Sequence, residues 1–253
     1  MKYRIFILLL AAMVCTLWAD GKYVSYRVNE APFEGYLVMT DTQAPLVFLV
    51  HDWDGLTDYE VKRSDMLSGL GYTVFAADLF GAGVRPKTIA EKRQLTGALY
   101  ADRDKMRALM KGALTAAKNA GANTNNAVAM GYCFGGTAVL ELARSGANLK
   151  GFVAFHGGLT TPDGQDYADT KGMVLILHGT ADASVSMDDF ANLANALEQH
   201  NVPHEMITYS GAPHAFTVFG SERYRKDADR KSWQRFILFL QELLGARHAG
   251  TEK

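Results

Sequence analysis

One short segment constrains the fold of this chain more than any other. It spans residues 131–135, reads Gly-Tyr-Cys-Phe-Gly and has Cys133 at its centre, between the apolar run 127–130 and the helical pattern 137–145. Glycines two positions on either side allow a strand and a helix to pass closely at a sharp turn. The thiol then projects at the helix N-terminus, where amides and the helix dipole favour a thiolate. The segment therefore predicts a strand–turn–helix unit with a cysteine nucleophile. The alternative is a small buried hydrophobic cysteine.

Two further residues have the positions expected of an acid and a base that serve this cysteine. Asp182 follows the buried-strand pattern 173–177, and His214 follows a second strand pattern, 205–208. The carboxyl ends of parallel strands meet at one edge of a sheet, so the three side chains are expected to lie together. The order nucleophile, acid, histidine is that of the α/β-hydrolases. We therefore predict a Cys133–His214–Asp182 triad. The alternatives are that Asp182 caps a loop and that His214 is an ordinary surface histidine.

Several motifs resemble those of the dienelactone hydrolase family, over nearly the whole chain beyond the first twenty residues. They are Gly131-Tyr132-Cys133-Phe134-Gly135-Gly136, His178-Gly179-Thr180-Ala181-Asp182, Pro213-His214-Ala215-Phe216, Phe33-Glu34-Gly35-Tyr36-Leu37, His51-Asp52-Trp53-Asp54-Gly55 and Ala77-Asp78-Leu79-Phe80-Gly81. The resemblance implies an α/β-hydrolase fold and an enzyme that hydrolyses an ester or lactone.

The predicted triad indicates how such a reaction would run. His214 would accept the thiol proton, and Asp182 would orient its ring. Cys133 would attack an ester-type carbonyl and form a thioester, which water then hydrolyses. The predicted oxyanion donors are the backbone N–H of Phe134, directly after the nucleophile, and that of Trp53, in the loop after the first parallel strand. The alternative for Trp53 is that it only lines the pocket.

Two positions depart from the family pattern. The family commonly has a glutamate that holds the resting thiol protonated, and this chain has the shorter Asp52 there. The family's dienelactone activity also implies a carboxylate-binding arginine a few residues after the histidine, and residues 215–218 contain none. Arg85 is either a substitute cation or a solvated loop residue. We therefore expect a neutral or differently placed ester, lactone or thioester as substrate, rather than dienelactone.

Short apolar runs alternate with longer amphipathic patterns. The runs that predict strands are 45–50, 72–77, 127–130, 151–155, 173–177 and 204–208. The patterns that predict helices are 59–70, 90–120, 137–145, 187–200 and 226–244. Apolar strands separated by helices are typical of a mostly parallel central sheet with helices on both faces. We expect an antiparallel edge from 22–28 and 35–40, a polar turn at 123–126, and a single domain over 20–253.

Residues 1–19 are expected to be a secretory signal peptide, because a basic start precedes an apolar run that ends at the small residue Ala19. The predicted location is secreted or periplasmic, and an uncleaved membrane anchor is the alternative. Cleavage would remove Cys15, one of two cysteines, and leave Cys133 without an intramolecular disulfide partner. A lone thiol in an oxidising compartment favours a functional role, although a buried inert cysteine would also persist there.

Composition argues against nucleic acid as a partner. Cleavage would remove Lys2 and Arg4 from the 26 basic residues, which leaves 24 against 27 acidic ones, and no basic stripe is present. The expected partner is a small ester or lactone, with no cofactor and no stable membrane association after cleavage. The sequence does not indicate an oligomeric state.

Other functions compete with the hydrolase prediction. A metal site is one alternative, and its candidate ligands are His51, His156 and His178 with Asp52 or Asp54. Strand-end histidines are more often hydrogen-bonded residues at the rim of a site, so no metal is expected. A non-catalytic binding protein of the same fold and an acyl transferase are the remaining alternatives.

Overall fold

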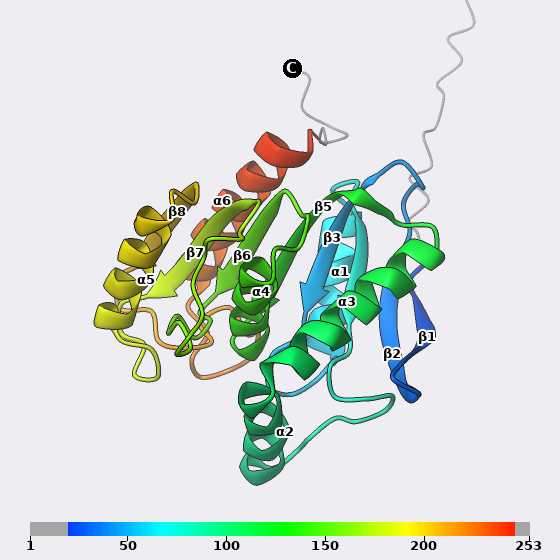
Figure 1. The fold of residues 1–253 in the computed structure, drawn as a ribbon, viewed down its shortest axis with the longest axis horizontal. Helices are drawn as coiled ribbons and strands as arrows, with labels where there is room; N and C mark the ends of the chain where they lie inside the picture. Colours follow the sequence, from blue (N-terminus) through cyan, green and yellow to red (C-terminus); the bar gives the residue numbers. More distant parts are fainter. Residues whose placement is uncertain (1–19, 246–253) are drawn as a thin grey trace, which may run out of the picture.

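Residues 20–245 are described by a computed structural model, in which one eight-stranded sheet forms the centre of the molecule (Figure 1). In spatial order the strands are β1 (Lys22–Val28), β2 (Ala31–Val38), β4 (Thr73–Ala77), β3 (Pro45–Val50), β5 (Asn123–Tyr132), β6 (Gly151–Phe155), β7 (Met173–Gly179) and β8 (His204–Tyr209). The strands from β4 to β8 are parallel, and β2 is antiparallel to both β1 and β4. The predicted signal peptide, residues 1–19, lies outside the described residues.

Helices cover both faces of this sheet. On one face lie α3 (Arg103–Asn119), α4 (Phe134–Arg144) and α5 (Met187–Gln199), and on the other lie α1 (Asp58–Ser68) and α6 (Lys226–Leu244). The remaining helix, α2 (Ile89–Ala101), lies beyond the carboxyl ends of the strands, at the bottom of Figure 1. The predicted mostly parallel sheet with helices on both faces is therefore confirmed.

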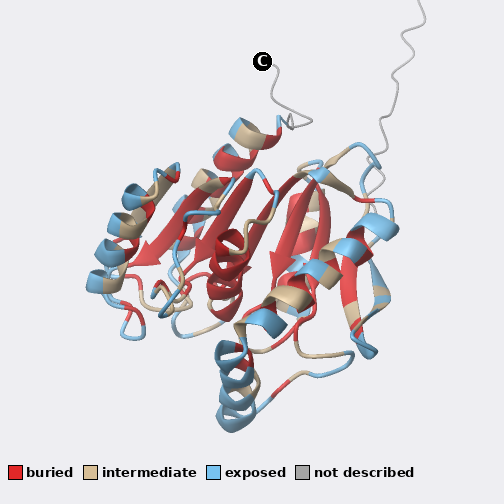
Figure 2. Cartoon of the chain, viewed as in Figure 1, coloured by how far each residue is buried: buried red, intermediate tan, exposed pale blue. Residues whose placement is uncertain are grey.

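The central strands are buried on both faces, as Figure 2 shows. In β3, Leu46, Phe48 and Val50 belong to the core under α3, α4 and α5. Val47 and Leu49 belong to the core under α1 and α6. Because side chains alternate between the faces of a strand, a strand that contributes to two cores is a continuous apolar run.

The single helix predicted over residues 90–120 is two helices. Asp102 separates them, with its own N–H donating to the carbonyl of Ala98 at the end of α2. Its side chain accepts the N–H of Lys105 at 2.9 Å and so caps the start of α3. Aspartate at such a position begins a new helix because it satisfies a free backbone donor of the first turn.

The predicted polar turn at residues 123–126 is instead the beginning of β5. Asn123 pairs with Pro45 and Ala127 with Leu46, so the pairing register shifts between the two. This irregularity accommodates the polar residues within the strand. The β2 strand also begins at Ala31, earlier than the predicted segment 35–40.

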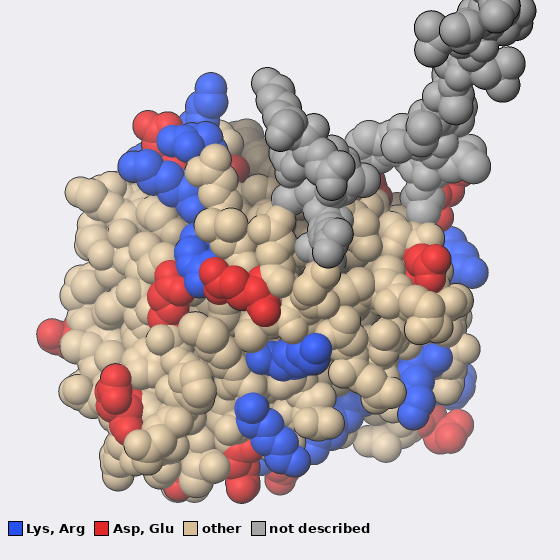
Figure 3. Space-filling model, turned by 90° about the horizontal axis from the view of Figure 1, so that it is seen from above, with Lys and Arg blue, Asp and Glu red and all other residues tan. Residues whose placement is uncertain are grey.

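The two ends of the parallel strands face different surfaces. The carboxyl ends lie near α2, whereas α6 ends and β1 begins at the opposite surface (Figure 1). Figure 3 views that opposite surface, where basic and acidic side chains are interspersed among uncharged atoms. No helix within residues 20–245 is long and apolar enough to cross a membrane.

Candidate active site

Cys133 occupies the turn between β5 and α4 in a strained backbone conformation. Its φ is 52° and its ψ is −113°, outside the regions that L-residues ordinarily adopt. A Cβ at Gly131 would lie 2.3 Å from the backbone of Gly135, and one at Gly135 would lie 2.2 Å from the carbonyl oxygen of Val50. Two glycines therefore permit the close passage of strand and helix, and the turn places the thiol at the start of α4.

The thiol of Cys133 lies beside the ring of His214, which also contacts Asp182. His214 Nε2 is 3.0 Å from Cys133 Sγ, and His214 Nδ1 is 2.8 Å from Asp182 Oδ2. The other oxygen of Asp182 accepts the N–H groups of Ser184 at 2.8 Å and Val185 at 3.0 Å. These two amides hold the carboxylate, which in turn orients the ring. The three side chains of the predicted triad therefore form one hydrogen-bonded row.

Electrostatics in this row favour a protonated histidine. Burial alone would lower the pKa of His214, but the hydrogen bonds and charges of Asp182 and Cys133 raise it to about 10. Burial also acts to raise the pKa of Asp182, yet its hydrogen bond to His214 and its backbone donors hold that pKa below the usual value. At neutral pH an imidazolium thus lies between the carboxylate of Asp182 and the sulfur of Cys133, and it can donate a hydrogen bond to each.

Replacing His214 with alanine is expected to move the midpoint of Cys133 alkylation to higher pH. The protonated ring, 3.0 Å from the sulfur, stabilises the reactive anion, so its loss leaves less thiolate at a given pH. The measurement is the rate of reaction with iodoacetamide across a pH series, in protein that lacks residues 1–19 and therefore has a single thiol. His200→Ala, at the end of α5, is the control. Coincident profiles for His214→Ala and wild type would show that the two side chains do not interact.

The residues of the two predicted oxyanion donors share one cavity with the thiol. Trp53 and Phe134 both line the cavity that contains Cys133. Phe134 is the first residue of α4, and the first N–H groups of a helix have no partner within the helix. This amide is therefore available to an oxyanion that forms beside the sulfur.

The loop that carries Trp53 is held from α1 and from α2. Glu60 of α1 accepts the N–H of Thr57 at 2.8 Å and completes a capping box with it. Lys92 of α2 forms an ion pair with Asp54, and its ammonium group lies 5.1 Å from the centre of the Trp53 ring. The position of Trp53, the predicted second oxyanion donor, therefore depends on both helices.

Asp52 lines the same cavity but does not hydrogen-bond to Cys133 within the described residues. Its carboxylate accepts the N–H of Asp54 at 2.7 Å, and its own N–H donates to the buried Glu60 at 3.4 Å. Burial raises the pKa of Asp52 to about 6, against the opposing effect of the Asp54 N–H. The contact that the resemblance implies for the family's glutamate is therefore not formed by the shorter side chain.

The cavity over the thiol has a volume of about 430 Å³ and includes residues that the sequence analysis missed. These are Arg93, Thr96, Tyr100, Gly158, Ser184, Val185, Ala215 and Arg223. The three from α2 are spaced three and four residues apart and so lie on one helix face. This spacing, which is visible in the sequence, is the signal from which their shared helix face could have been predicted. The neighbouring loop segments 84–88 and 159–169 do not line this cavity.

Arginines other than the predicted one supply positive charge to this cavity. Arg85 does not line it, and its guanidinium donates to the carbonyl of Val84 at 2.8 Å. Arg93 and Arg223 line it, both are exposed, and neither forms an ion pair within residues 20–245. Arg85 therefore lies outside this cavity, whereas Arg93 and Arg223 line it.

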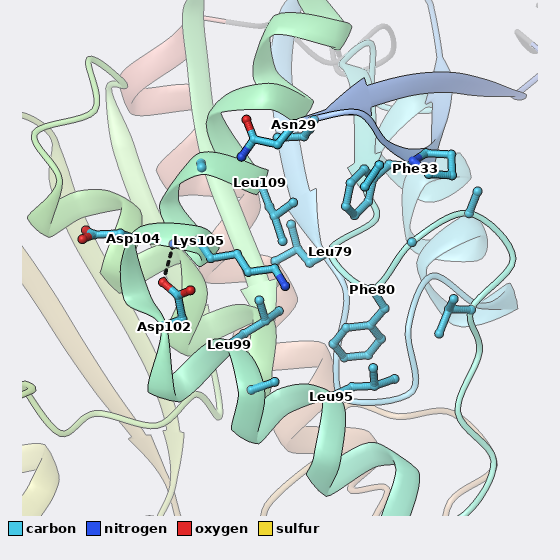
Figure 4. A pocket seen from close by; sticks show the side chains of 18 residues that line it. Asn29, Phe33, Leu79, Phe80, Leu95, Leu99, Asp102, Asp104, Lys105 and Leu109 are labelled. Carbon is cyan, nitrogen blue, oxygen red and sulfur yellow. Dashed lines mark hydrogen bonds between the residues drawn. The ribbon is translucent and has the colours of Figure 1, made fainter.

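A second and larger cavity, of about 890 Å³, lies between α2, α3 and β2 and does not contain the triad (Figure 4). Its apolar lining includes Phe33, Leu79, Phe80, Leu95, Leu99 and Leu109. The ring centre of Phe80 lies 4.6 Å from that of His51 and 5.5 Å from that of Phe134. One face of α2 therefore borders the thiol cavity, and another face borders this apolar one.

The three strand-end histidines do not converge on a metal site. His51 Nε2 accepts the N–H of Leu79 at 3.1 Å, and His156 Nε2 is 2.8 Å from Thr217 Oγ1. His178 is buried beneath α5. Among the residues that the structure describes, no three His, Cys, Asp or Glu side chains are grouped to hold an ion.

Comparisons with known proteins agree with one another. The sequence model of the dienelactone hydrolase family matches residues 33–244. The protein named "Putative carboxymethylenebutenolidase" of Escherichia coli (strain K12) is 25% identical over 219 residues, which are 82% of this chain and 80% of the relative. The protein named "Probable 2-oxo-3-(5-oxofuran-2-ylidene)propanoate lactonase" of Bradyrhizobium sp is 24% identical over 214 residues, which are 80% of this chain and 86% of the relative.

Solved structures show the same fold. The structure named "m3DLH" superposes with a TM-score of 0.83 and 30% identity, over 89% of this chain and 98% of that one. A dienelactone hydrolase-like promiscuous phosphotriesterase from metagenomic libraries superposes with a TM-score of 0.81 and 27% identity, over 88% and 98% of the two chains. The predicted α/β-hydrolase fold is therefore confirmed.

Proposed function

The chain belongs to the dienelactone hydrolase family, and on this premise we propose that it is an exported hydrolase that cleaves a small ester or lactone through a thioester on Cys133. One observation carries the proposal, the row of atoms from Asp182 through His214 to the thiol with separations of 2.8 and 3.0 Å. The family and the lactonase and butenolidase names of relatives support hydrolysis of such a bond.

In the proposed first half-reaction, the sulfur of Cys133 attacks the carbonyl carbon. The N–H groups of Phe134 and Trp53 bind the resulting oxyanion, and one such donor contributes about 3 kcal/mol of transition-state stabilisation. The carbon–oxygen bond to the alcohol then breaks, and His214 Nε2 donates a proton to the leaving oxygen. In a lactone this hydroxyl stays attached to the acyl group, so the ring opens on the enzyme.

Water completes the reaction. His214, now neutral, removes a proton from a water molecule, and the hydroxide attacks the thioester carbon. The carbon–sulfur bond breaks, the sulfur leaves as a thiolate beside the reprotonated His214, and a carboxylic acid is released. Asp182 keeps Nδ1 protonated throughout, so that Nε2 exchanges the proton.

The two arginines at the cavity support a substrate that carries a carboxylate. Arg93 projects from α2 and Arg223 from the segment before α6, so the cavity has two cations from opposite parts of the chain. A guanidinium binds a carboxylate through two parallel hydrogen bonds. Positive charge thus favours an anionic ester or lactone over the neutral substrate expected from the sequence.

The proposal is tested by assaying residues 20–253 against paired esters and lactones that differ only in a carboxylate. Hydrolysis is expected for both members of a pair, with higher kcat/KM for the anionic one. Absence of hydrolysis across the panel would favour the binding-protein alternative. Export is tested separately, by N-terminal sequencing of protein recovered outside the cytoplasm, which should begin at Asp20 if Ala19 ends the signal peptide.

Arg93→Ala and Arg223→Ala are each expected to raise KM for the anionic substrate about tenfold, which corresponds to ~1.4 kcal/mol of lost binding. The neutral partner substrate should be unaffected, because it offers no charge to either guanidinium. Arg85→Ala is the matched control, since it removes an arginine outside the cavity. An equal loss on both substrates would argue against carboxylate binding.

A further inference from the structure

A buried polar cluster lies next to His214 and contains no member of the triad. Its centre is Thr217, three residues after His214, which is fully buried. Around it are Tyr59 and Arg63 from α1 and His156 from the end of β6. Arg63 and His156 are 0% and 1% exposed. Polar groups so deep in a protein are costly unless they are hydrogen-bonded, so their partners define the cluster.

Thr217 is held by all three neighbours. Its Oγ1 is 2.8 Å from the hydroxyl of Tyr59 and 2.8 Å from His156 Nε2. Its carbonyl oxygen accepts a hydrogen bond from Arg63 Nη2 at 3.0 Å. Arg63 is itself fixed by an ion pair of 2.5 Å with the buried Asp229 of α6. The loop after His214 is therefore tied to α1, β6 and α6 through one residue.

Arg63 fixes one hydrogen-bond direction in this cluster. A guanidinium only donates, so Arg63 Nε donates to the hydroxyl oxygen of Tyr59 at 3.3 Å. The Tyr59 hydroxyl in turn lies 3.3 Å from the carbonyl oxygen of Thr217, to which it donates, and either hydroxyl can be the donor in the bond between Tyr59 and Thr217 Oγ1. Burial holds the pKa of His156 well below its usual value, so this ring is neutral. Its bond to Thr217 forms with either neutral tautomer, because the Thr217 hydroxyl can donate to Nε2 or accept from it.

His156 connects this cluster to the triad by packing. Its ring meets that of His214 edge to face, with centres 5.4 Å apart and an interplanar angle of 63°. Its Nδ1 is buried and has no hydrogen-bond partner among the described residues. The bond to Thr217 is therefore the one hydrogen bond that orients the His156 ring, beside its packing against Tyr132 and Phe216. Loss of that bond removes the polar contact that fixes the surface against which His214 packs.

We infer that Thr217 is a positioning residue for the reaction. It holds the imidazole of His214 in line with the sulfur of Cys133, both through the short backbone segment that joins Thr217 to His214 and through the ring of His156. The inference rests on the proposed function for its catalytic consequence, and on geometry alone for the His214–Cys133 alignment. A displacement of about 1 Å in such a row can cost a hundredfold in rate. Because the side-chain group at the centre of the cluster is the Thr217 hydroxyl, a substitution can remove its hydrogen bonds and keep the side-chain volume.

The test compares Thr217→Val with Thr217→Ser. Valine has the shape of threonine without the hydroxyl, so it leaves His156 Nε2 without its partner, while the Tyr59 hydroxyl keeps the carbonyl oxygen of residue 217 and Arg63 Nε. Serine keeps the hydroxyl. We expect Thr217→Val to lower kcat for ester hydrolysis about ten- to a hundredfold with a much smaller change in KM, and Thr217→Ser to remain within about threefold of wild type. Ser64→Ala, which removes a buried hydroxyl that donates only to the Glu60 carbonyl, is the control for lost stability.

The closing measurement is the pH profile of Cys133 alkylation, which requires no turnover. The charged and titratable groups near His214 and Cys133 are Asp182, Asp52, His156, His178, Tyr100, Arg93 and Arg223, and none of them changes in these variants. Thr217→Val is expected to move the midpoint to higher pH, while Thr217→Ser and Ser64→Ala retain the wild-type profile. A Thr217→Val profile identical to wild type would overturn the inference, as would a Thr217→Ser profile that shifts equally. If the wild type hydrolyses no ester and Thr217→Val still shifts its profile, the alignment role stands and the proposed function fails.

Discussion

Cys133→Ala is expected to lower kcat for ester hydrolysis by a factor on the order of 10⁵. The substitution removes the nucleophile while leaving the oxyanion donors and the cavity in place, so only weak catalysis of direct water attack remains. The backbone strain at position 133 arises from its φ of 52°, which alanine and cysteine tolerate equally. The thermal unfolding midpoint should therefore change little, and the loss is one of chemistry rather than of folding.

Cys133→Ser is the companion variant. Serine keeps a nucleophile of similar size, but its hydroxyl is far less acidic than a thiol, so the protonated His214 no longer faces a stable anion. We expect activity between those of wild type and Cys133→Ala, together with a lower pKa of His214, because its pKa of about 10 depends on the bond and charge of the sulfur. Steady-state kinetics and NMR titration of the imidazole measure the two effects. Unchanged turnover in Cys133→Ala would exclude the thiol mechanism.

The triad could be predicted from the sequence because each of its members sits at a local junction that short motifs encode. Cys133 is flanked by glycines that must lack a Cβ, because one at Gly131 would meet the backbone of α4 and one at Gly135 would meet the backbone at the end of β3. Asp182 and His214 follow the apolar runs that become β7 and β8, and adjacent parallel strands bring their carboxyl ends together. Strand order alone therefore determines that the three lie at one edge.

The rest of the site depends on where helices break and on contacts between distant segments. The sequence spacing of Arg93, Thr96 and Tyr100 indicates one helix face, but the position of that face at the thiol cavity follows from the end of α2 at Asp102, which the sequence prediction of one continuous helix lacked. The Thr217 cluster joins residues more than 150 positions apart, such as Arg63 and Thr217 with a separation of 154. No periodicity in one segment indicates such a contact, because it is set by tertiary packing.

Gly135→Ala is expected to destabilise the protein by about 3–5 kcal/mol, and so to lower the thermal unfolding midpoint by roughly 10 °C. An added Cβ would lie 2.2 Å from the carbonyl oxygen of Val50 and 2.5 Å from that of His51. Both atoms belong to the backbone at the end of β3, which is paired with β4 on one side and β5 on the other. A strand fixed on both sides cannot retreat, so α4 must move away and open the core beneath it.

Gly97→Ala is the matched control for the steric clash of an added Cβ at position 135. Gly97 lies within α2, and an added Cβ there would meet no atom within 4 Å. Alanine is preferred over glycine in a helix interior by about 0.5–1 kcal/mol, so Gly97→Ala should stabilise the protein slightly. Both variants make the same chemical change within a helix, and urea unfolding should move in opposite directions for the two. Equal behaviour would mean that α4 does not pass β3 at the distance that the nucleophile turn requires.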